Sequence, residues 1–431
     1  MYKNIGRESL WVSSMPCVLH GENDIPIAKY GPSNIGQMKH IYRRGLGYRY
    51  GKTMQSIAGI HFNFSLADSF WHQWREITQS SLPLHDFKSA MYFSMVRNFY
   101  RILWLVLYLF GASPAVCKTF LEGRSHSLQN FNNATLFLPF ATSLRMGDIG
   151  YQSDVQTKIP ININSLSEYC ESLLVATRTP YPAYQSIGIK VGSNYRQLNA
   201  NLLQIENEYY APIRPKRVAR SGEKPTAALQ QRGVEYIEIR CIDLDPFLPL
   251  GIDESGIKFL ELLLLHCLLD NSPSFDQIEE EHLRINRNRI ILNGRQPDLL
   301  IATETGEQFM ADAGKTLLNQ MRPIADLLEK SGEIGYRDAL AQQTMKFEDP
   351  ELTPSAQILA SMRNQDISFF EFAMNQSRKH QEFFQRKLLS KAEEQRFRDE
   401  ADNSLKCQLA LESADTLSLD NFLDQVLSDQ R

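Results

Sequence analysis

The chain has 431 residues, which at roughly 150 residues per domain corresponds to about three domains or to one large domain with appendages. Its 46 basic and 50 acidic residues give a formal charge of −4, which argues against a protein that binds nucleic acid over its whole surface. Hydrophobic residues make up 43% of the chain, a proportion that excludes an intrinsically disordered protein.

The start of the chain and its cysteines indicate a cytoplasmic location. The first residues contain no apolar segment of the kind found in secretory signals. The longest apolar run, 102–110, is shorter than the roughly 18 residues of a membrane span, so we expect no membrane partner. The six cysteines are widely spaced and form no CxxC pair, so we expect neither a zinc site nor a disulfide framework.

In chain order, the first 80 residues are rich in Gly, Asn, Ser and Tyr and contain short strand-like pieces. Segment 95–110 is mostly apolar and free of Pro and Gly, which predicts one buried helix. Gly111 suits the end of that helix, and Ser113 with Pro114 predicts the cap and first position of another.

The second half of the chain predicts strands followed by helices. Residues 166–177 and the apolar segment 257–269 predict helices, whereas residues 185–245 alternate and carry β-type residues. Helical patterns dominate from 279 onward, and segment 378–400, with 12 charged residues among 23, predicts one solvated amphipathic helix. These elements indicate an α+β protein with a mostly antiparallel sheet, helices on one side of it and a helical C-terminal region.

Three of the predicted strands carry polar faces. In the first, 58–65, period-two alternation turns the apolar residues 60, 62 and 64 one way and His61, Asn63 and Ser65 the other. A polar face over an aromatic back is typical of a binding cleft, although an ordinary half-exposed strand has the same alternation.

The second strand, 202–210, carries two carboxylates on one face. Glu206 and Glu208 share that face with Gln204, while the residues between them point the other way. Oxygen ligands of this kind suit a hard cation such as Mg²⁺, and a solvent-facing strand is the alternative.

The third strand, 234–246, places Glu238 and Arg240 on one face, about 6.6 Å apart for a rise of roughly 3.3 Å per residue. This pair is either a surface ion pair or part of a metal–phosphate site. In such a site one group holds Mg²⁺ and the other neutralises a phosphoryl oxygen.

Segment 214–224, between the second and third strands, has five basic residues and one acidic residue. Its glycine and flanking prolines predict a mobile loop, which is either simply solvated or closes over a polyphosphate. The sequence contains no P-loop, dinucleotide-binding or hydrolase nucleophile motif.

Nine short strings occur in order along the chain. They are SMPC at 14–17, YGPSN at 30–34, YRRGL at 42–46, GIHFNFS at 59–65, YLFGASPA at 108–115, ATSLR at 141–145, QIENE at 204–208, YAPIRPKR at 210–217 and EYIEIR at 235–240. Together, in this order and at similar spacing, they resemble the bacterial glutamate–cysteine ligases of the proteobacterial type, also called γ-glutamylcysteine synthetases. The resemblance continues more loosely to about residue 400.

This resemblance implies an ATP-dependent ligase that makes γ-glutamylcysteine in the first step of glutathione synthesis. ATP phosphorylates the γ-carboxylate of glutamate, and the amine of cysteine then displaces the phosphate. The implied fold is a curved antiparallel sheet of the glutamine-synthetase catalytic type with flanking helices. We therefore expect a catalytic domain over 1–330 and a C-terminal helical region over 331–431. The implied cofactors are ATP and Mg²⁺, with Mn²⁺ as a substitute, the partners are small molecules, and a monomer is favoured.

The resemblance also implies roles for individual residues. His61 and Glu238 would be metal ligands, and Arg240 would contact the transferring phosphoryl group. The glutamate site would include Gln55, Ile57 and Asn63. The cysteine site would be lined by Tyr42, Leu46, Arg145, Tyr151 and Tyr210, with Arg145 suited to a bidentate contact with the carboxylate. The nucleotide would be contacted by Arg214, Lys216 and Arg217.

The resemblance fails at the front of the chain. Members of the family carry a further N-terminal segment with a Gly-x-Glu-x-Glu strand, which supplies most of the carboxylates around their metals. Nothing before Met1 corresponds to it, so we expect the chain as given to be inactive or nearly so. Two other interpretations stay open: a non-catalytic remnant that binds cysteine or nucleotide, and another carboxylate–amine ligase of the same fold.

Overall fold

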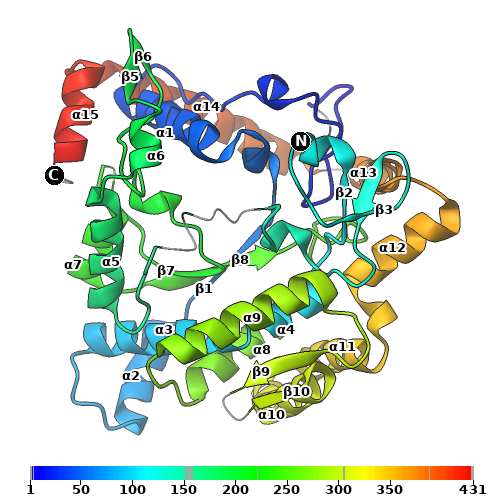
Figure 1. Ribbon diagram of the computed structural model, residues 1–431. Helices are drawn as coiled ribbons and strands as arrows, with labels where there is room; N and C mark the ends of the chain where they lie inside the picture. The colour runs from blue at the N-terminus through cyan, green and yellow to red at the C-terminus, as the bar shows by residue number, and fades with distance from the viewer. Residues whose placement is uncertain are drawn as a thin grey trace.

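The computed structural model of the chain describes residues 2, 4–150, 155, 159–220, 222–303, 306–387 and 389–428. An antiparallel sheet lies at its centre, in the order β1 (Ile60–Phe64), β8 (Tyr236–Ile242) and β7 (Ile213–Lys216) (Figure 1). The helices α3 (Leu84–Arg101), α4 (Leu103–Phe110) and α8 (Glu254–Leu269) form the apolar core behind it. The predicted α+β class is confirmed.

The register of the sheet turns polar side chains of all three strands to one face. Asn63 of β1 and Arg214 of β7 are both paired with Glu238 of the central strand. On the opposite face, Ile237 and Ile239 are fully buried in the core. The period-two faces predicted for 58–65 and 234–246 are therefore confirmed within β1 and over 236–241 of β8, whereas Ile242 at the end of β8 is buried in the core.

The long apolar segment forms two helices instead of the one predicted. Helix α3 ends at Arg101, Ile102 leaves helical geometry at φ −109° and ψ 11°, and α4 continues with a bend of 60°. The bend allows α3 to contact β7 while α4 contacts β8, so that the apolar stretch follows the back of the sheet. Within the described residues no single helix is long and apolar enough to cross a membrane, and α3 and α4 meet that criterion only as this bent pair.

Two of the shorter predictions have different outcomes. The helices predicted over 166–177 and 257–269 are confirmed as α5 (Leu166–Arg178) and α8. The helix predicted to start at Ser113 is wrong, because Ala115–Cys117 is strand β2. The Ser113 hydroxyl donates to Asp243 instead of capping a helix, a partner that lies 130 residues further along the chain.

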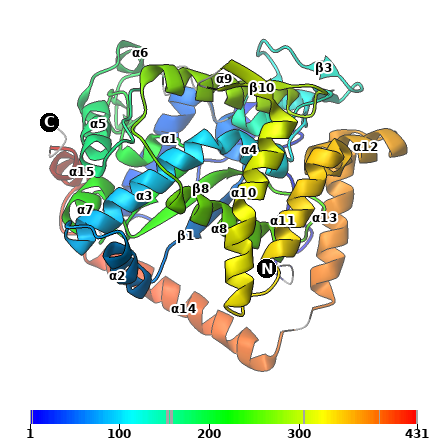
Figure 2. The same cartoon turned by 90° about the horizontal axis from the view of Figure 1, so that it is seen from below.

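The prediction of one continuous helix over 378–400 is wrong, because this segment belongs to two separate helices. Ser368 and Glu371 form the capping box of α13 (Phe369–Gln385), and Ser390 and Glu393 form that of α14 (Lys391–Ser413). Figure 2 shows α14 running along the outside of the molecule, and none of its residues is buried. The chain ends in α15 (Leu419–Ser428), which packs against α1 (Asn34–Tyr50).

The remaining elements surround this core. The other helices are α2 (Asp68–Ile77), α6 (Pro182–Gln185), α7 (Pro225–Arg232), α9 (Gln277–Asn293), α10 (Met310–Lys330), α11 (Tyr336–Glu348) and α12 (Pro354–Gln365). Strand β2 pairs with β4 (Thr135–Phe137), which also pairs with β3 (Gln129–Asn130). Two hairpins are formed by β5 (Lys190–Val191) with β6 (Asn194–Tyr195), and by β9 (Leu300–Thr303) with β10 (Gly306–Phe309). The 3₁₀ helices are η1 (Glu22–Asp24), η2 (Thr53–Ser56), η3 (Lys118–Leu121), η4 (Leu144–Met146), η6 (Glu206–Glu208) and η7 (Pro350–Leu352).

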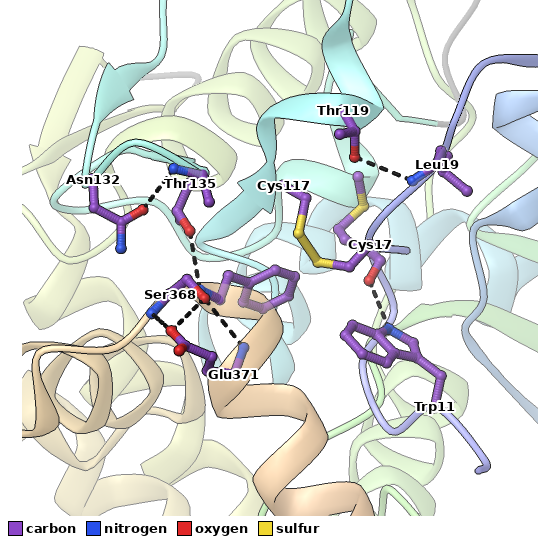
Figure 3. The surroundings of a disulfide bond; sticks show 12 residues. Trp11, Cys17, Leu19, Cys117, Thr119, Asn132, Thr135, Ser368 and Glu371 are labelled. Carbon is purple, nitrogen blue, oxygen red and sulfur yellow. Dashed lines mark hydrogen bonds between the residues drawn. A yellow bond between two sulfur atoms is a disulfide. The ribbon is translucent and has the colours of Figure 1, made fainter. Parts of the chain in front are cut away.

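A disulfide between Cys17 and Cys117 ties the N-terminal segment to β2 (Figure 3). Beside it, the backbone N–H of Leu19 donates to the hydroxyl of Thr119 at 3.2 Å. The sequence predicted no disulfide framework and did not reveal this single bond, because sequence spacing detects only local pairs and folding brings these two cysteines together. The free cysteines are the buried Cys170, Cys241 and Cys267 and the exposed Cys407.

Replacing Cys17 and Cys117 by serine is expected to lower the free energy of unfolding by about 4 to 5 kcal/mol, because the bond spans 100 residues of the unfolded chain. Urea unfolding without reductant measures the change. The matched control is Cys407→Ser, which removes an exposed free thiol and is expected to leave the midpoint unchanged. A reductant is expected to destabilise the natural chain but not the double variant, and equal shifts in both would contradict this role.

Candidate functional site

A cavity of about 300 Å³ lies between α1, the polar face of the sheet and the segment before β7. Six of the predicted site residues line it, namely Tyr42, Leu46, Gln55, Tyr210, Arg214 and Arg240. The structure therefore brings together residues that are up to 198 positions apart in the sequence.

Helix α1 supplies one wall of this cavity, although short strands were predicted for this part of the chain. The Ser33 side chain accepts from the N–H of Gly36 and caps the helix. Gly45 then allows close packing, since a Cβ there would lie 2.2 Å from the side-chain oxygen of Gln204. This close approach places Tyr42 and Leu46, on either side of the glycine, at the cavity.

The segment 202–210 is not the strand predicted, and its two carboxylates do not form the proposed Mg²⁺ face. Glu206 accepts hydrogen bonds from the backbone N–H and hydroxyl of Thr226, at 2.8 and 2.5 Å. Glu208 is paired with Arg49 at 2.9 Å and accepts from the Tyr50 hydroxyl at 2.7 Å. Both carboxylates are buried and serve to hold neighbouring elements in place.

The side chains of Glu238, His61, Arg240 and Lys216 meet on the polar face of the sheet. Glu238 Oε1 lies 3.5 Å from His61 Nδ1, and Oε2 lies 3.6 Å from Arg240 Nε and 3.7 Å from Lys216 Nζ. Arg240 Nε also lies 3.4 Å from His61 Nε2. One carboxylate is thus surrounded by three nitrogen groups.

This environment controls the charges of the cluster. Burial by itself raises the pKa of Glu238, but the hydrogen bond from His61 and the charges of Lys216 and Arg240 outweigh it and lower the pKa to about 2. Burial lowers the pKa of Lys216, and the Glu238 carboxylate only partly opposes that effect. Glu238 is therefore an anion at every pH at which the protein would work.

The two predicted metal ligands, His61 and Glu238, are neighbours in the structure. Within the described part of the chain, no third His, Cys, Asp or Glu joins them in a group that could hold a metal ion. Mg²⁺ commonly needs only one or two protein ligands when substrate phosphates complete its shell. The pair fits a cation that arrives with a nucleotide.

The other predicted residues are more dispersed. Asn63 is exposed on the same face of β1 as His61, whereas Ile57 is buried in a hydrophobic cluster away from the cavity lining. Arg217 donates to the carbonyls of Arg232 and Gly233.

Arg214 and Lys216 lie in β7, so the mobile loop predicted over 214–224 is wrong for its first residues. Tyr151 lies outside the described residues.

Arg145 is 1% exposed and lies behind the cavity wall, not in it. Its Nε is 2.5 Å from Asp243 Oδ1, while its Nη1 is 3.4 Å from both the Tyr210 hydroxyl and the Arg240 carbonyl. Burial disfavours the charged guanidinium, but Tyr210 and Asp243 outweigh burial and raise its pKa. Gly59 leaves room for the guanidinium, since a Cβ there would lie 2.6 Å from Nη1.

Asp243 is the site residue that sequence reasoning missed. Its second oxygen accepts from the N–H of Ala112 at 2.8 Å and the hydroxyl of Ser113 at 2.7 Å. A signal was present, because Asp243 continues the buried face of β8 after Ile239 and Cys241. A carboxylate on such a face requires a buried partner.

Comparisons with known proteins agree with this geometry. The family model described as glutamate–cysteine ligase matches residues 1–290. The glutamate–cysteine ligase of Alcanivorax borkumensis is 45% identical over 100% of this chain and 83% of that protein, and the one from Pseudomonas putida KT2440 is 47% identical over 98% and 81%.

Solved structures give the same result. The glutamate–cysteine ligase of Francisella tularensis in complex with AMP superposes with a TM-score of 0.90 and 33% identity, over 98% of this chain and 83% of that chain. A bifunctional glutathione synthetase from Pasteurella multocida, with a TM-score of 0.64 and 23% identity over 88% and 43% of the two chains, shares the fold.

Asp243→Asn is expected to lower the free energy of unfolding by about 3 to 5 kcal/mol, because it leaves the buried Arg145 guanidinium without a counter-charge. Urea denaturation at neutral pH measures the loss. Glu281→Gln is the matched control, since it removes a carboxylate from the exposed pair with Arg284 and is expected to cost less than about 1 kcal/mol. Equal losses of unfolding free energy in the two variants would show that the buried pair stabilises the protein no more than an exposed pair does.

Proposed function

The chain belongs to the glutamate–cysteine ligase family, and from this premise we propose that it joins the γ-carboxylate of glutamate to the amine of cysteine at the expense of ATP. The observation that carries the proposal is the Glu238, His61, Arg240 and Lys216 cluster beside a cavity large enough for an amino acid. The family match to 1–290 supports a catalytic domain within 1–330.

In the first step, an oxygen of the glutamate γ-carboxylate attacks the γ-phosphorus of ATP, the bond to ADP breaks, and an acyl phosphate forms. Negative charge spreads over the transferring group and moves onto the leaving ADP. Arg240 and Lys216 are fixed cations on the sheet that neutralise this charge without having to move. Nucleotide use is supported by the AMP complex of the Francisella relative.

His61 and Glu238 would hold a divalent cation, Mg²⁺ or Mn²⁺, together with the phosphates of the nucleotide. The cation would supply further neutralisation of phosphate charge. Glu238 is ready for this role because its low pKa keeps it ionised.

In the second step, the amine of cysteine attacks the acyl carbon, the bond to phosphate breaks, and the amine loses a proton as the amide forms. Tyr42, Leu46 and Tyr210 form the acceptor wall of the cavity, and Gln55 lies at the same opening. Gln55, Ile57 and Asn63 are assigned to the glutamate side, Arg217 to the nucleotide and Tyr151 to the acceptor, as the family resemblance implies. Arg145 acts from behind, by holding Tyr210 and the Arg240 carbonyl in position.

The test is cysteine-dependent release of phosphate from ATP by the 431-residue chain in the presence of glutamate and Mg²⁺. Glu238→Gln and Arg240→Gln are each expected to lower the rate by about 10² to 10³, because each removes a charge aligned with the transferring group. Glu281→Gln, which neutralises an exposed carboxylate, is the control and retains the full rate.

Phosphate release that needs no cysteine, or a Glu238→Gln variant as active as the control, would contradict the proposal.

A further inference from the structure

A second cavity, of about 630 Å³, lies between the first turns of α9, the junction of α3 with α4, and the segment 159–164. Of the described residues, Tyr209 alone lines both this cavity and the one on the polar face of the sheet. Tyr100 and Leu103 belong to the helices that cover the apolar back of the sheet. The second cavity is therefore separate from the reaction cluster, and the proposed ligase reaction assigns no role to the residues that line it.

One part of the wall of this second cavity is apolar. Leu283 of α9 and Leu103 at the start of α4 line it together with Ile161 and the ring of Phe275. The ring of Phe275 meets that of Tyr100 edge-on, with 6.4 Å between the centroids. An apolar wall with a few polar groups is typical of sites that hold the body of a small organic molecule.

Arg287 brings a positive charge into this cavity. Within the described part of the chain its guanidinium forms no ion pair and no hydrogen bond, and its Nε is buried without an acceptor. Other buried arginines do have partners, since Arg145 is paired with Asp243 at 2.5 Å and Arg97 donates to the carbonyl of Asn164 at 2.7 Å. A guanidinium carries five N–H donors, so those of Arg287 are left for a ligand.

Neighbouring groups do not neutralise this charge. Burial raises the pKa of Tyr100 and of Tyr209, so both phenols are uncharged at neutral pH. Glu280 lines the same cavity, but it precedes Arg287 by two turns of α9, which is about 10.5 Å along the axis. Asp148 is exposed to water and acts on the guanidinium only from a distance. Burial lowers the pKa of Arg287, which is the sign of a cation that an anion would stabilise.

We propose that this cavity binds a monocarboxylate with an apolar body, whose carboxylate contacts Arg287 while its body lies against Leu283 and Phe275. One guanidinium without a partner matches one negative charge in a bidentate contact. Arg284, the other arginine of the cavity, is already paired with Glu281 at 2.6 Å. A polyphosphate would therefore lack a second available cation. The inference goes beyond the proposed function, because the ligand is neither a substrate nor a product of the ligase reaction.

The test uses phenylbutyrate as the probe and phenylbutanol, which has the same body without the charge, as its neutral counterpart. Calorimetric titration of the 431-residue chain is expected to show the carboxylate binding about 10- to 100-fold tighter, because hydrogen bonds between charged groups are strong. Arg287→Met is expected to remove this preference and to leave the binding of phenylbutanol unchanged. Arg287→Lys, which keeps the charge but not the planar fork, is expected to lower the preference about threefold.

Arg289→Met is the matched control, because it makes the same change two residues further along α9, at an arginine paired with Glu307. It is expected to keep the preference for the carboxylate. Melting temperatures separate a ligand-binding role from a structural one. Arg287→Met is expected to keep or raise the melting temperature, since it removes a charge without partners, whereas Arg289→Met breaks a pair and is expected to lower it slightly.

The inference is overturned if the two probes bind equally, if Arg287→Met keeps the preference, or if it lowers the melting temperature more than Arg289→Met does. The affinity for phenylbutyrate is expected to stay the same in saturating cysteine, glutamate and Mg-ATP. Displacement of the probe by any of these would place it in the reaction cavity and would also overturn the inference. These measurements need no turnover, so they are independent of whether the proposed ligase activity is found.

Discussion

The buried ion pair between Arg145 and Asp243 connects the core of this protein to its candidate site. Asp243, which directly follows β8, connects three parts of the chain, because it accepts hydrogen bonds from Arg145 in η4 and from Ala112 and Ser113 after α4. Arg145 in turn contacts the hydroxyl of Tyr210 and the carbonyl of Arg240. A buried pair is tolerated only when its remaining hydrogen-bonding groups are satisfied, and here those groups hold the cavity wall in place.

The distribution of charge separates residues that hold the fold from residues available to a ligand. Arg145 with Asp243 and Arg49 with Glu208 are balanced pairs, so they stabilise positions and offer nothing to a substrate. Glu238 has more positive neighbours than it can neutralise. Such an excess of positive charge at a fixed place is what a phosphoryl transfer needs, because the negative charge it must stabilise is delivered by the substrates.

Sequence periodicity predicted the strands correctly where one face is buried against the core and the other face is polar. Segments 58–65 and 234–246 were predicted correctly because each has one apolar face against the core and one polar face, which is the pattern that a half-buried strand requires. The same reasoning failed for 202–210, because a loop whose carboxylates are satisfied by Thr226 and Arg49 produces a similar alternation. Hydropathy also missed the break at Ile102, since both helices are apolar and the bend depends on the sheet they cover.

The sequence by itself determined the α+β class and the family, and it singled out His61, Glu238 and Arg240 as the candidate cluster, because these depend on local patterns and on strings that the family shares. Only the tertiary structure decided which carboxylates are structural, that Cys17 is bonded to Cys117, that Arg145 is buried and that Arg214 lies in the cavity. The physical reason is distance along the chain. Arg145 and Asp243 are 98 residues apart, and the charge that each one faces exists only once the chain has folded.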